Sequence, residues 1–304
     1  MLITDIKYIV NVREETKLLR GNELSNLPIL ENAFLQINGG KIDDYGLMSS
    51  LTEQNFKQEI YDAKQATVLP SWCDSHTHLV FAASRENEFI DKINGLSYAE
   101  IAAKGGGILN SANKLNETSE EILAEQAQAR LNELIKLGTG AIEIKSGYGL
   151  SVEGELKMLR VIQQLKKQNS IPIKATFLGA HAFPTLYQEN RTAYIDLIVN
   201  EMLPQIAKEN LADYIDVFCE QGFFTQQETE QICNAGIEYG LKSKIHANQL
   251  NISGGVQAGV NINAISVDHL ETIGDEEIQL LSKNNSPIAT LLPSCSFFLR
   301  MQYA

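Results

Sequence analysis

The chain has 304 residues, of which 44% are hydrophobic and 21% are charged, and it contains only 7 prolines. This composition is typical of a globular protein that buries one sizeable core, and it excludes a disordered chain and a fibre. The formal net charge of -13 makes nucleic acid and an anionic membrane surface poor partners, because both require a basic face. A small-molecule substrate is therefore the expected partner.

Cysteine usage and the N-terminal segment indicate the compartment. The chain contains four cysteines, which are Cys73, Cys219, Cys233 and Cys295. They lie far apart and form no CxxC pair, which argues against a disulfide framework and a structural zinc ribbon. The segment MLITDIKYIVNVREE lacks the basic start of a signal peptide, and no run approaches the roughly 18 apolar residues of a membrane helix. These features predict a cytoplasmic protein without a membrane segment.

Residues 1–67 have the pattern of a small β domain. Apolar and polar positions alternate in short runs that are broken by Asn, Gly and Asp, as in AFLQINGGKIDDYG over residues 33–46. This pattern predicts short antiparallel strands joined by turns. From residue 68 onward, short apolar runs alternate with longer segments of helical periodicity, so residues 68–304 are expected to form a second domain.

The second domain contains seven apolar runs that are typical of buried strands. They are TVLPSWCDSHTH, TGAIEIKSGYG, IPIKATFLGAHAF, DYIDVFCEQG, KSKIHAN, AISVDHLE and SPIATLLPS. Two segments between them, residues 119–138 and 151–168, carry apolar side chains at three- and four-residue spacing and predict helices. Strands that alternate with helices predict a parallel sheet, either open or curled into a (β/α) barrel, and a complete barrel would need an eighth strand.

A glycine-rich stretch, AKGGGILNS at residues 103–111, follows the first of these strands at some distance. It has no GK[ST] ending and no strand directly before it. A flexible loop near a site and an ordinary surface loop in the first crossover both fit this stretch. No GxGxxG sequence follows the first strand, so a dinucleotide-binding fold has no support.

All five histidines lie at the carboxyl end of a predicted strand. They are His76, His78, His181, His246 and His269. In a parallel barrel these strand ends open on one face, where the loops after the strands build the active site. A single histidine at a strand end is more often a structural residue than a ligand. The joint placement of five favours convergence on one site.

The HxH pair of His76 and His78 predicts a metal site. On an extended strand both imidazoles point to the same face, about 7 Å apart at the backbone, and can bind one ion. A third histidine from another strand would complete a catalytic type of site that keeps a position open for water. A divalent or ferric ion there would lower the pKa of bound water and polarise a carbonyl oxygen, so hydrolysis is the expected chemistry.

Three side chains near the predicted site have two interpretations each. Arg85 could pair in a bidentate manner with a substrate carboxylate, although a lone arginine here would be read as an exposed surface cation. Tyr148 stands in a glycine-flanked turn, where it offers a hydroxyl contact or packs as an aromatic ring. Lys145 is either a salt-bridge partner or a catalytic group.

The histidine pattern resembles that of the amidohydrolase superfamily, whose members are metal-dependent (β/α) barrels flanked by a small β-sandwich built from both chain ends. Within it, the words HTHLVFAASRENEF, GGGILNS, EIKSGYGL, TFLGAHAFP, DVFCEQG and DHLE are similar to those of the imidazolonepropionase family. These enzymes hydrolyse a cyclic amide in histidine degradation. The resemblance runs from about residue 68 to 300 and implies a TIM-like (β/α) barrel with an N-terminal β-sandwich part.

The resemblance implies a role for each candidate residue. It assigns one zinc or iron ion per subunit to His76, His78 and His246. It assigns the substrate, including its carboxylate tail, to Arg85, Tyr148, His181 and Gln249. His269 would help to activate water or to steady the tetrahedral intermediate. The implied reaction is attack of metal-bound water on the ring amide of 4-imidazolone-5-propanoate, which gives N-formimidoyl-L-glutamate, and the implied assembly is a homodimer.

Two positions depart from the family pattern. Gln249 stands where superfamily deaminases, and some imidazolonepropionases, have a glutamate that shuttles protons. Glutamine cannot do so, which weakens the alternative of a deaminase. The aspartate expected as the last metal ligand, at the end of an eighth strand, would lie beyond Ala304. We therefore expect an incomplete barrel with unpaired strand edges, poor stability and little activity. A non-catalytic truncated remnant is the remaining alternative.

Overall fold

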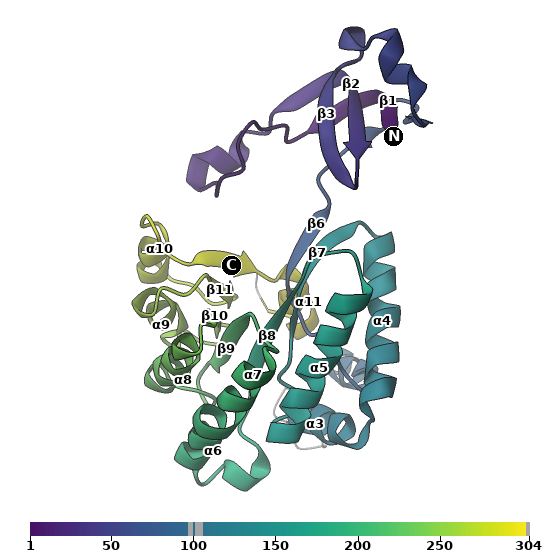
Figure 1. The fold of residues 1–304 in the computed structure, drawn as a ribbon. Coiled ribbons are helices and arrows are strands. Elements are labelled where there is room, and N and C mark those ends of the chain that lie inside the picture. Colours follow the sequence, from purple (N-terminus) through teal and green to yellow (C-terminus); the bar gives the residue numbers. More distant parts are fainter. Residues whose placement is uncertain (97–99, 101–105, 302–304) are drawn as a thin grey trace. The chain divides into compact units, whose positions relative to one another are not determined.

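The computed structural model describes residues 1–96, 100 and 106–301 (Figure 1). The chain divides into two compact units, Met1–Ser71 and Trp72–Ala304. Within the part of the chain that the structure describes, none of the helices combines the length and apolar character needed to cross a bilayer.

The first unit is one five-stranded sheet with three short 3-10 helices. Its strands are β1 (Leu2–Val10), β2 (Ile29–Asn38), β3 (Lys41–Leu47), β4 (Ile60–Asp62) and β5 (Thr67–Val68), and its 3-10 helices are Gly21–Ser25, Met48–Ser50 and Glu53–Lys57. Gly39 and Gly40 join β2 to β3 with φ of 56° and 77°, as a tight hairpin turn requires. Ile6, Ile9 and Ala33 are buried between the strands.

The sequence-based expectation of antiparallel pairing is confirmed for β1 with β2 and for β2 with β3. It is wrong for β4 and β5, which both run parallel to β1. The physical reason is the connection: the chain between β3 and β4 passes through two 3-10 helices instead of a tight turn. Such a crossover is long enough to bring the next strand back in the same direction.

The second unit is a nearly closed (β/α) barrel of seven parallel strands, which confirms the predicted fold class and all seven predicted strands. In chain order they are β6 (Trp72–Thr77), β7 (Thr139–Lys145), β8 (Ile173–Ala180), β9 (Tyr214–Cys219), β10 (Lys242–Ala247), β11 (Ser266–His269) and β12 (Ile288–Leu291). Each strand pairs with its neighbours in the chain. An eighth strand does not occur among the described residues. All carboxyl ends of the strands therefore lie on the same face.

Helices follow the strands (Figure 1). They are α1 (Glu86–Ile93), α3 (Ile108–Glu117), α4 (Glu120–Lys136), α5 (Val152–Gln168), α6 (Arg191–Leu197), α7 (Leu203–Glu209), α8 (Gln226–Glu238), α9 (Gly255–Asn261), α10 (Asp275–Leu281) and α11 (Pro293–Leu299). Of these, α4, α5, α8 and α9 pack against the strands on the outer side of the sheet. The two helices predicted by periodicity are α4 and α5. The hydroxyl oxygens of Ser119 and Ser151 cap their first turns by accepting a backbone N–H.

The glycine-rich stretch at residues 103–111 is only partly a loop. Residues 103–105 lie outside the described residues, and α3 begins at Ile108, so the expectation of a loop is wrong for residues 108–111. Gly107 precedes the helix with φ of 84°, a left-handed conformation that glycine adopts without a steric penalty. Its backbone N–H donates to Oε1 of Glu88 over 2.8 Å, which ties the start of α3 to α1.

A close backbone contact fixes the turn after β7 against the first turn of α5. A Cβ added to Gly149 would lie 2.2 Å from the carbonyl carbon of Gly154, and one added to Gly154 would lie 2.7 Å from Cα of Gly149. The turn can approach the helix so closely only because both residues lack a side chain. This turn carries Tyr148, so the two glycines help to define where that ring lies.

We predict that Gly149→Ala lowers the free energy of unfolding by about 2 to 3 kcal/mol, because the new methyl group forces the turn away from α5. Urea unfolding monitored by circular dichroism measures the loss. Leu137→Ala, which truncates a 75% exposed side chain, serves as the control and should change stability little. A Gly149→Ala variant as stable as the control would contradict the close contact.

Candidate functional site

The five histidines come together at the carboxyl ends of the strands. His76 lies in β6 and His78 directly follows it, His181 follows β8, His246 lies in β10 and His269 ends β11. The ring centroid of His246 lies 4.5 Å from that of His76, 5.0 Å from that of His269 and 5.8 Å from that of His181. The structure therefore places every histidine of the chain in one cluster.

Three of these imidazoles could hold a metal ion. Ligand atoms of His76, His78 and His246 all lie within 4.8 Å of one another. Nε2 of His246 and Nε2 of His78 face each other over 3.3 Å, and Nε2 of His76 has no hydrogen-bond partner among the described residues. A cation between these nitrogen atoms would be bound by their lone pairs, and it would also give Nε2 of His76 a partner. The donor set and its open coordination position fit zinc or a similar ion.

Two buried carboxylates hold the rings of this triad. Oδ2 of Asp268 in β11 lies 2.7 Å from Nδ1 of His76, and Oδ2 of Asp216 in β9 lies 2.9 Å from Nδ1 of His246. Each contact places the ring proton on Nδ1 and leaves Nε2 as a lone-pair donor toward the cluster. A carboxylate behind a metal-binding histidine fixes its tautomer and its orientation in this way.

Next to the histidines, the barrel interior contains paired charged side chains where many barrels have apolar ones. Nζ of Lys145 lies 2.9 Å from Oε1 of Glu143 and 2.9 Å from Oδ2 of Asp216. Nζ of Lys244 lies 3.1 Å from Asp268. Of the two interpretations of Lys145, the geometry favours the salt-bridge partner, because its ammonium group is fully buried among carboxylates.

Burial lowers the pKa of four of the histidines, which are His76, His78, His181 and His246. Burial, followed by the positive charge of Lys145, holds the pKa of His76 well below its ordinary value, and burial also lowers the pKa of His78 and of His246. Burial is also the main reason why the pKa of His181 falls to about 3. Burial disfavours ionisation of Asp216, but His246 and Lys145 outweigh it and lower the pKa of that carboxyl. A neutral imidazole is the form that binds metal.

A cavity of about 310 Å³ opens above the triad. Arg85, which directly precedes α1, and Lys92 in α1 line it together with Tyr148, His181, Gln249 and His269. The guanidinium group of Arg85 is about one-third exposed and lies 3.7 Å from Oε2 of Glu88. Because Arg85 and Lys92 are seven residues apart at the start and along one face of α1, both can present a positive charge to the same ligand.

Tyr148 and His181 form one wall of this cavity. The tyrosine ring lies 5.5 Å from the ring of His78 and 5.4 Å from that of His181, which itself stacks on His78 at 5.2 Å. Nδ1 of His181 donates to the carbonyl oxygen of Gly147 over 2.9 Å, which leaves its Nε2 as an acceptor.

A single buried carboxylate positions that wall. Oε2 of Glu155 accepts from the backbone N–H of Gly147 over 3.0 Å, and its Oε1 accepts from Gly149 and Leu150 over 2.8 and 2.9 Å. The residues on both sides of Tyr148 are thus bound to one side chain, and the Gly147 carbonyl in turn orients His181.

Gln249 and His269 lie on the opposite wall. Nε2 of Gln249 donates to Sγ of Cys295 over 3.3 Å. Nδ1 of His269 donates to Oε1 of Glu271 over 3.3 Å, and His269 has φ of 88° where β11 ends. The left-handed backbone turns the chain sharply at this point and lets Glu271 approach the histidine ring from behind.

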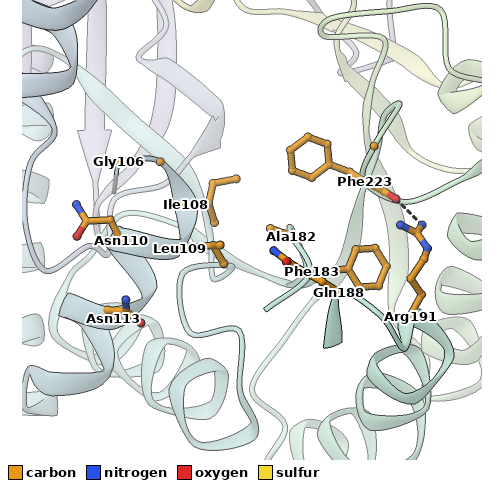
Figure 2. Close-up of a pocket in the computed structure, with 12 residues that line it drawn as sticks. Gly106, Ile108, Leu109, Asn110, Asn113, Ala182, Phe183, Gln188, Arg191 and Phe223 are labelled. Atoms are coloured by element: carbon orange, nitrogen blue, oxygen red, sulfur yellow. Dashed lines mark hydrogen bonds between the residues drawn. The ribbon is translucent and has the colours of Figure 1, made fainter. Parts of the chain in front are cut away.

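A second cavity, of about 510 Å³, adjoins the first (Figure 2). Both cavities are lined by Ile108 from α3 and Phe223 from the loop after β9. Arg191 donates to the carbonyl oxygen of Phe223, as Figure 2 shows, and its guanidinium group lies 4.1 Å from the ring centroid of Phe183. The second cavity contains no histidine.

Sequence reasoning missed Asp216, Asp268, Glu155 and Lys92. A signal was present for the two aspartates, because inward-facing positions of a barrel strand alternate. The patterns EIK at 143–145, DVF at 216–218, KIH at 244–246 and SVD at 266–268 each place a polar residue at an alternate position of an apolar strand. Such residues in a buried strand point to the interior. Glu155 and Lys92 lie in helices, where their charge is ordinary.

We predict that Asp216→Asn weakens binding of the first equivalent of zinc by about 10- to 100-fold, because the amide no longer fixes the Nδ1 proton of His246. Competition with a chromophoric chelator measures the affinity. Asp213→Asn is the matched control, since Asp213 lies just before β9 and pairs with Lys166 and Lys174. Equal zinc affinity in the two variants would count against this histidine as a ligand.

No protein-family model matches the chain. Several solved structures share its fold at low identity. Guanine deaminase from C. acetobutylicum with bound guanine is 15% identical with a TM-score of 0.64, covering 99% of this chain and 69% of that one. Atrazine chlorohydrolase from Arthrobacter aurescens complexed with zinc is 13% identical with a TM-score of 0.59, covering 98% and 67%. These likenesses support the barrel fold.

Curated relatives are much more similar. Imidazolonepropionase from Flavobacterium johnsoniae is 56% identical over 303 residues, which cover 99% of this chain and 73% of the relative. The enzyme of the same name from Christiangramia forsetii is 53% identical, covering 100% and 74%. That from Thermoanaerobacter pseudethanolicus is 40% identical, covering 93% and 68%. The chain therefore belongs to the imidazolonepropionase family of metal-dependent hydrolases.

Proposed function

We propose that this chain hydrolyses the ring amide of 4-imidazolone-5-propanoate and releases N-formimidoyl-L-glutamate, a step of histidine degradation. The observation that carries the proposal is one cavity that is lined both by a three-histidine cluster and by the two cations Arg85 and Lys92. This arrangement suits a small cyclic amide with a carboxylate tail. The identity of 56% to a named relative supports the same reaction.

We assign one zinc or iron ion per subunit to His76, His78 and His246. Their Nε2 atoms point into the cluster and their Nδ1 atoms, in His76 and His246, are held by carboxylates. When bound, such an ion supplies Lewis acidity, which lowers the pKa of water and polarises a carbonyl oxygen. Which of the two metals is used depends on availability, since a three-histidine site accepts both.

The substrate would be held between α1 and the two cavity walls. Arg85 binds the propionate carboxylate, with Lys92 as a second positive charge, because charge-assisted pairs of this kind are strong in a partly buried cavity. Tyr148 contributes its hydroxyl group, His181 an Nε2 acceptor and Gln249 an amide toward the imidazolone ring. Together they direct the ring carbonyl toward the histidine cluster.

Proton transfer would rest on His269. With the proton on Nδ1 directed at Glu271, its Nε2 is free to accept a proton from the attacking water. Oxygen adds to the carbonyl carbon, the bond from that carbon to the ring nitrogen breaks, and His269 returns the proton to the departing nitrogen. Gln249 cannot exchange protons, which is why deamination is the less favoured reaction.

The remaining expectations also belong to this proposal. The net charge of -13 supports a small-molecule partner in place of nucleic acid or an anionic membrane. We further propose a homodimeric protein of the cytoplasm, as expected for an enzyme of amino-acid degradation.

Metal removal tests the proposed reaction directly. The untreated chain is expected to turn over 4-imidazolone-5-propanoate slowly. Chelator treatment should abolish this turnover, and one equivalent of zinc or ferrous ion should restore it. Mass spectrometry of N-formimidoyl-L-glutamate follows the product. Guanine serves as the competing substrate. Faster release of ammonia from guanine, or turnover that survives complete metal removal, would contradict the assignment.

The role of Arg85 is tested with a matched pair of substrates. We predict that Arg85→Ala lowers kcat/KM by about 10- to 100-fold for the natural propionate, since one charge-assisted pair is lost. The loss should disappear for the propionamide analogue, which has no carboxylate. Arg160→Ala, which breaks the exposed pair with Glu209, is the control. An equal loss with both substrates would assign Arg85 a structural role.

Glu155 is expected to act as a positioning residue. We predict that Glu155→Gln lowers kcat/KM by about tenfold or more, because its amide N–H atoms oppose the backbone donors of Gly147 or Gly149. Hydrogen exchange should accelerate at these two amides, a readout that general destabilisation would not confine to one turn. The exposed neighbour Glu153→Gln is the control. Unchanged exchange at the turn would refute the role.

A further inference from the structure

Behind His269 lies a second group of metal-binding side chains. Ligand atoms of His269, Glu271 and Cys295 all lie within 4.8 Å of one another. His269 and Glu271 come from the end of β11, and Cys295 comes from the first turn of α11. We propose that these three residues form a second, inhibitory site for zinc and related ions.

The three side chains are already arranged around one point. Both carboxylate oxygens of Glu271 lie 3.3 Å from Nδ1 of His269. Glu271 is 92% buried, and its Oε2 has no partner at normal hydrogen-bond geometry among the residues that the structure describes, although the thiol of Cys295 lies close enough to interact with the carboxylate. Since a full carboxylate is costly to bury with one oxygen unsatisfied, the pair is better suited to a cation than to its present surroundings.

The donor set indicates which ion fits. A nitrogen, an oxygen and a sulfur are ligands that zinc binds in tetrahedral sites, whereas magnesium and calcium require oxygen. With bonds of that kind, neighbouring ligand atoms are separated by about 3.3 to 3.8 Å. The 3.3 Å between Nδ1 of His269 and the carboxylate oxygens of Glu271 already lies in this range. The main adjustment needed is therefore a rotation of the Cys295 side chain.

The thiol of Cys295 stays protonated until a metal arrives. Burial, followed by the charge of Glu271, raises the pKa of Cys295 to about 12. A thiophilic ion displaces that proton on binding, as metals do at other cysteine ligands. The ion must also replace the contact of Gln249 Nε2 with Sγ at 3.3 Å, so the amide of Gln249 is released from its present position.

The second site is chemically distinct from the three-histidine cluster. The ring of His269 lies 5.0 Å from that of His246 and 5.1 Å from that of His76, and none of its three donors belongs to the triad. The triad contains only imidazole nitrogens. A signal from a metal-bound thiolate therefore reports on the second site and not on the triad.

Occupation of the second site would stop proton transfer, a consequence that rests on the proposed function. A neutral imidazole that binds metal through Nδ1 carries its proton on Nε2. That is the atom expected to accept a proton from the attacking water. The ion thus converts His269 from a proton acceptor into a donor, while the substrate also loses the oriented amide of Gln249.

Cobalt titration tests the site without reference to activity. Chelator-treated protein is titrated with CoCl2 and its absorption recorded. We expect a near-ultraviolet thiolate-to-cobalt charge-transfer band in addition to the visible bands of cobalt bound by histidine. The band should disappear in Cys295→Ser and require about tenfold more cobalt in Glu271→Gln. It should persist in Cys73→Ser, which removes the exposed cysteine.

Each outcome decides the proposal. The visible bands show that a variant is folded with its triad intact, and Glu271→Gln gives the answer should Cys295→Ser not fold. Lack of the charge-transfer band in the unaltered protein at saturating cobalt, or its persistence in Cys295→Ser, overturns the site.

An activity measurement then tests the inhibition separately. Zinc beyond one equivalent should reduce turnover of 4-imidazolone-5-propanoate, and Cys295→Ser should require about tenfold more zinc for the same fractional loss. If zinc inhibits both proteins equally, the second site does not cause the inhibition, although the cobalt spectra can still show that the site binds metal. A protein with one equivalent of zinc and no turnover at all refutes the proposed function and leaves the cobalt result valid.

Discussion

The site depends on the ionic interior of the barrel. Lys145 is completely buried and contacts Glu143 and Asp216, and Lys244 contacts Asp268. Burial lowers the pKa of Lys145, but Asp216 and Glu143 more than offset it and raise that pKa above its ordinary value. The two aspartates therefore remain ionised next to the histidines that they orient. Without the lysines, the carboxylates would be buried charges with no compensation.

The register of the strands places these charged side chains next to the histidines. In the β10 to β11 pairing, His246 lies opposite Asp268, and Lys244 lies opposite Ser266. In the β9 to β10 pairing, Lys244 lies opposite Asp216. A register shift of one residue would turn each of these side chains to the outer, apolar face. The hydrogen-bond register of three neighbouring strands is thus as important to the site as the identity of the histidines.

Much of this organisation can be predicted from the sequence, because the barrel carries strong local signals. Seven apolar runs and two amphipathic helices sufficed for a parallel arrangement of strands and helices, with the histidines at the strand ends. The resemblance to the amidohydrolase superfamily was needed to choose the barrel, in which the five rings converge. The direction of β4 and β5 could not be predicted, since strand direction depends on the connection and not on the alternation of residues. The start of α3 was hidden by the glycines before Ile108.

Apart from Lys92, which lines the cavity itself, the parts of the site that escaped prediction act through another residue. Glu155 has no distinguishing sequence feature, because a glutamate in the first turn of a helix is ordinarily a favourable charge near the helix dipole. Its function follows only from the three backbone N–H groups that converge on it. Lys92 likewise looks like a solvent-exposed cation near a helix end until the cavity is seen.

The ionic interior has a consequence for protein design. A three-histidine cluster copied onto another (β/α) barrel would sit above a layer of branched aliphatic side chains, which offer Nδ1 no acceptor. The rings would then be free to rotate and to bind protons at either nitrogen. A transplant would have to carry Asp216, Asp268 and their two lysines together with the histidines. The smallest portable unit of this active site is therefore a cross-section of the barrel and not a set of surface residues.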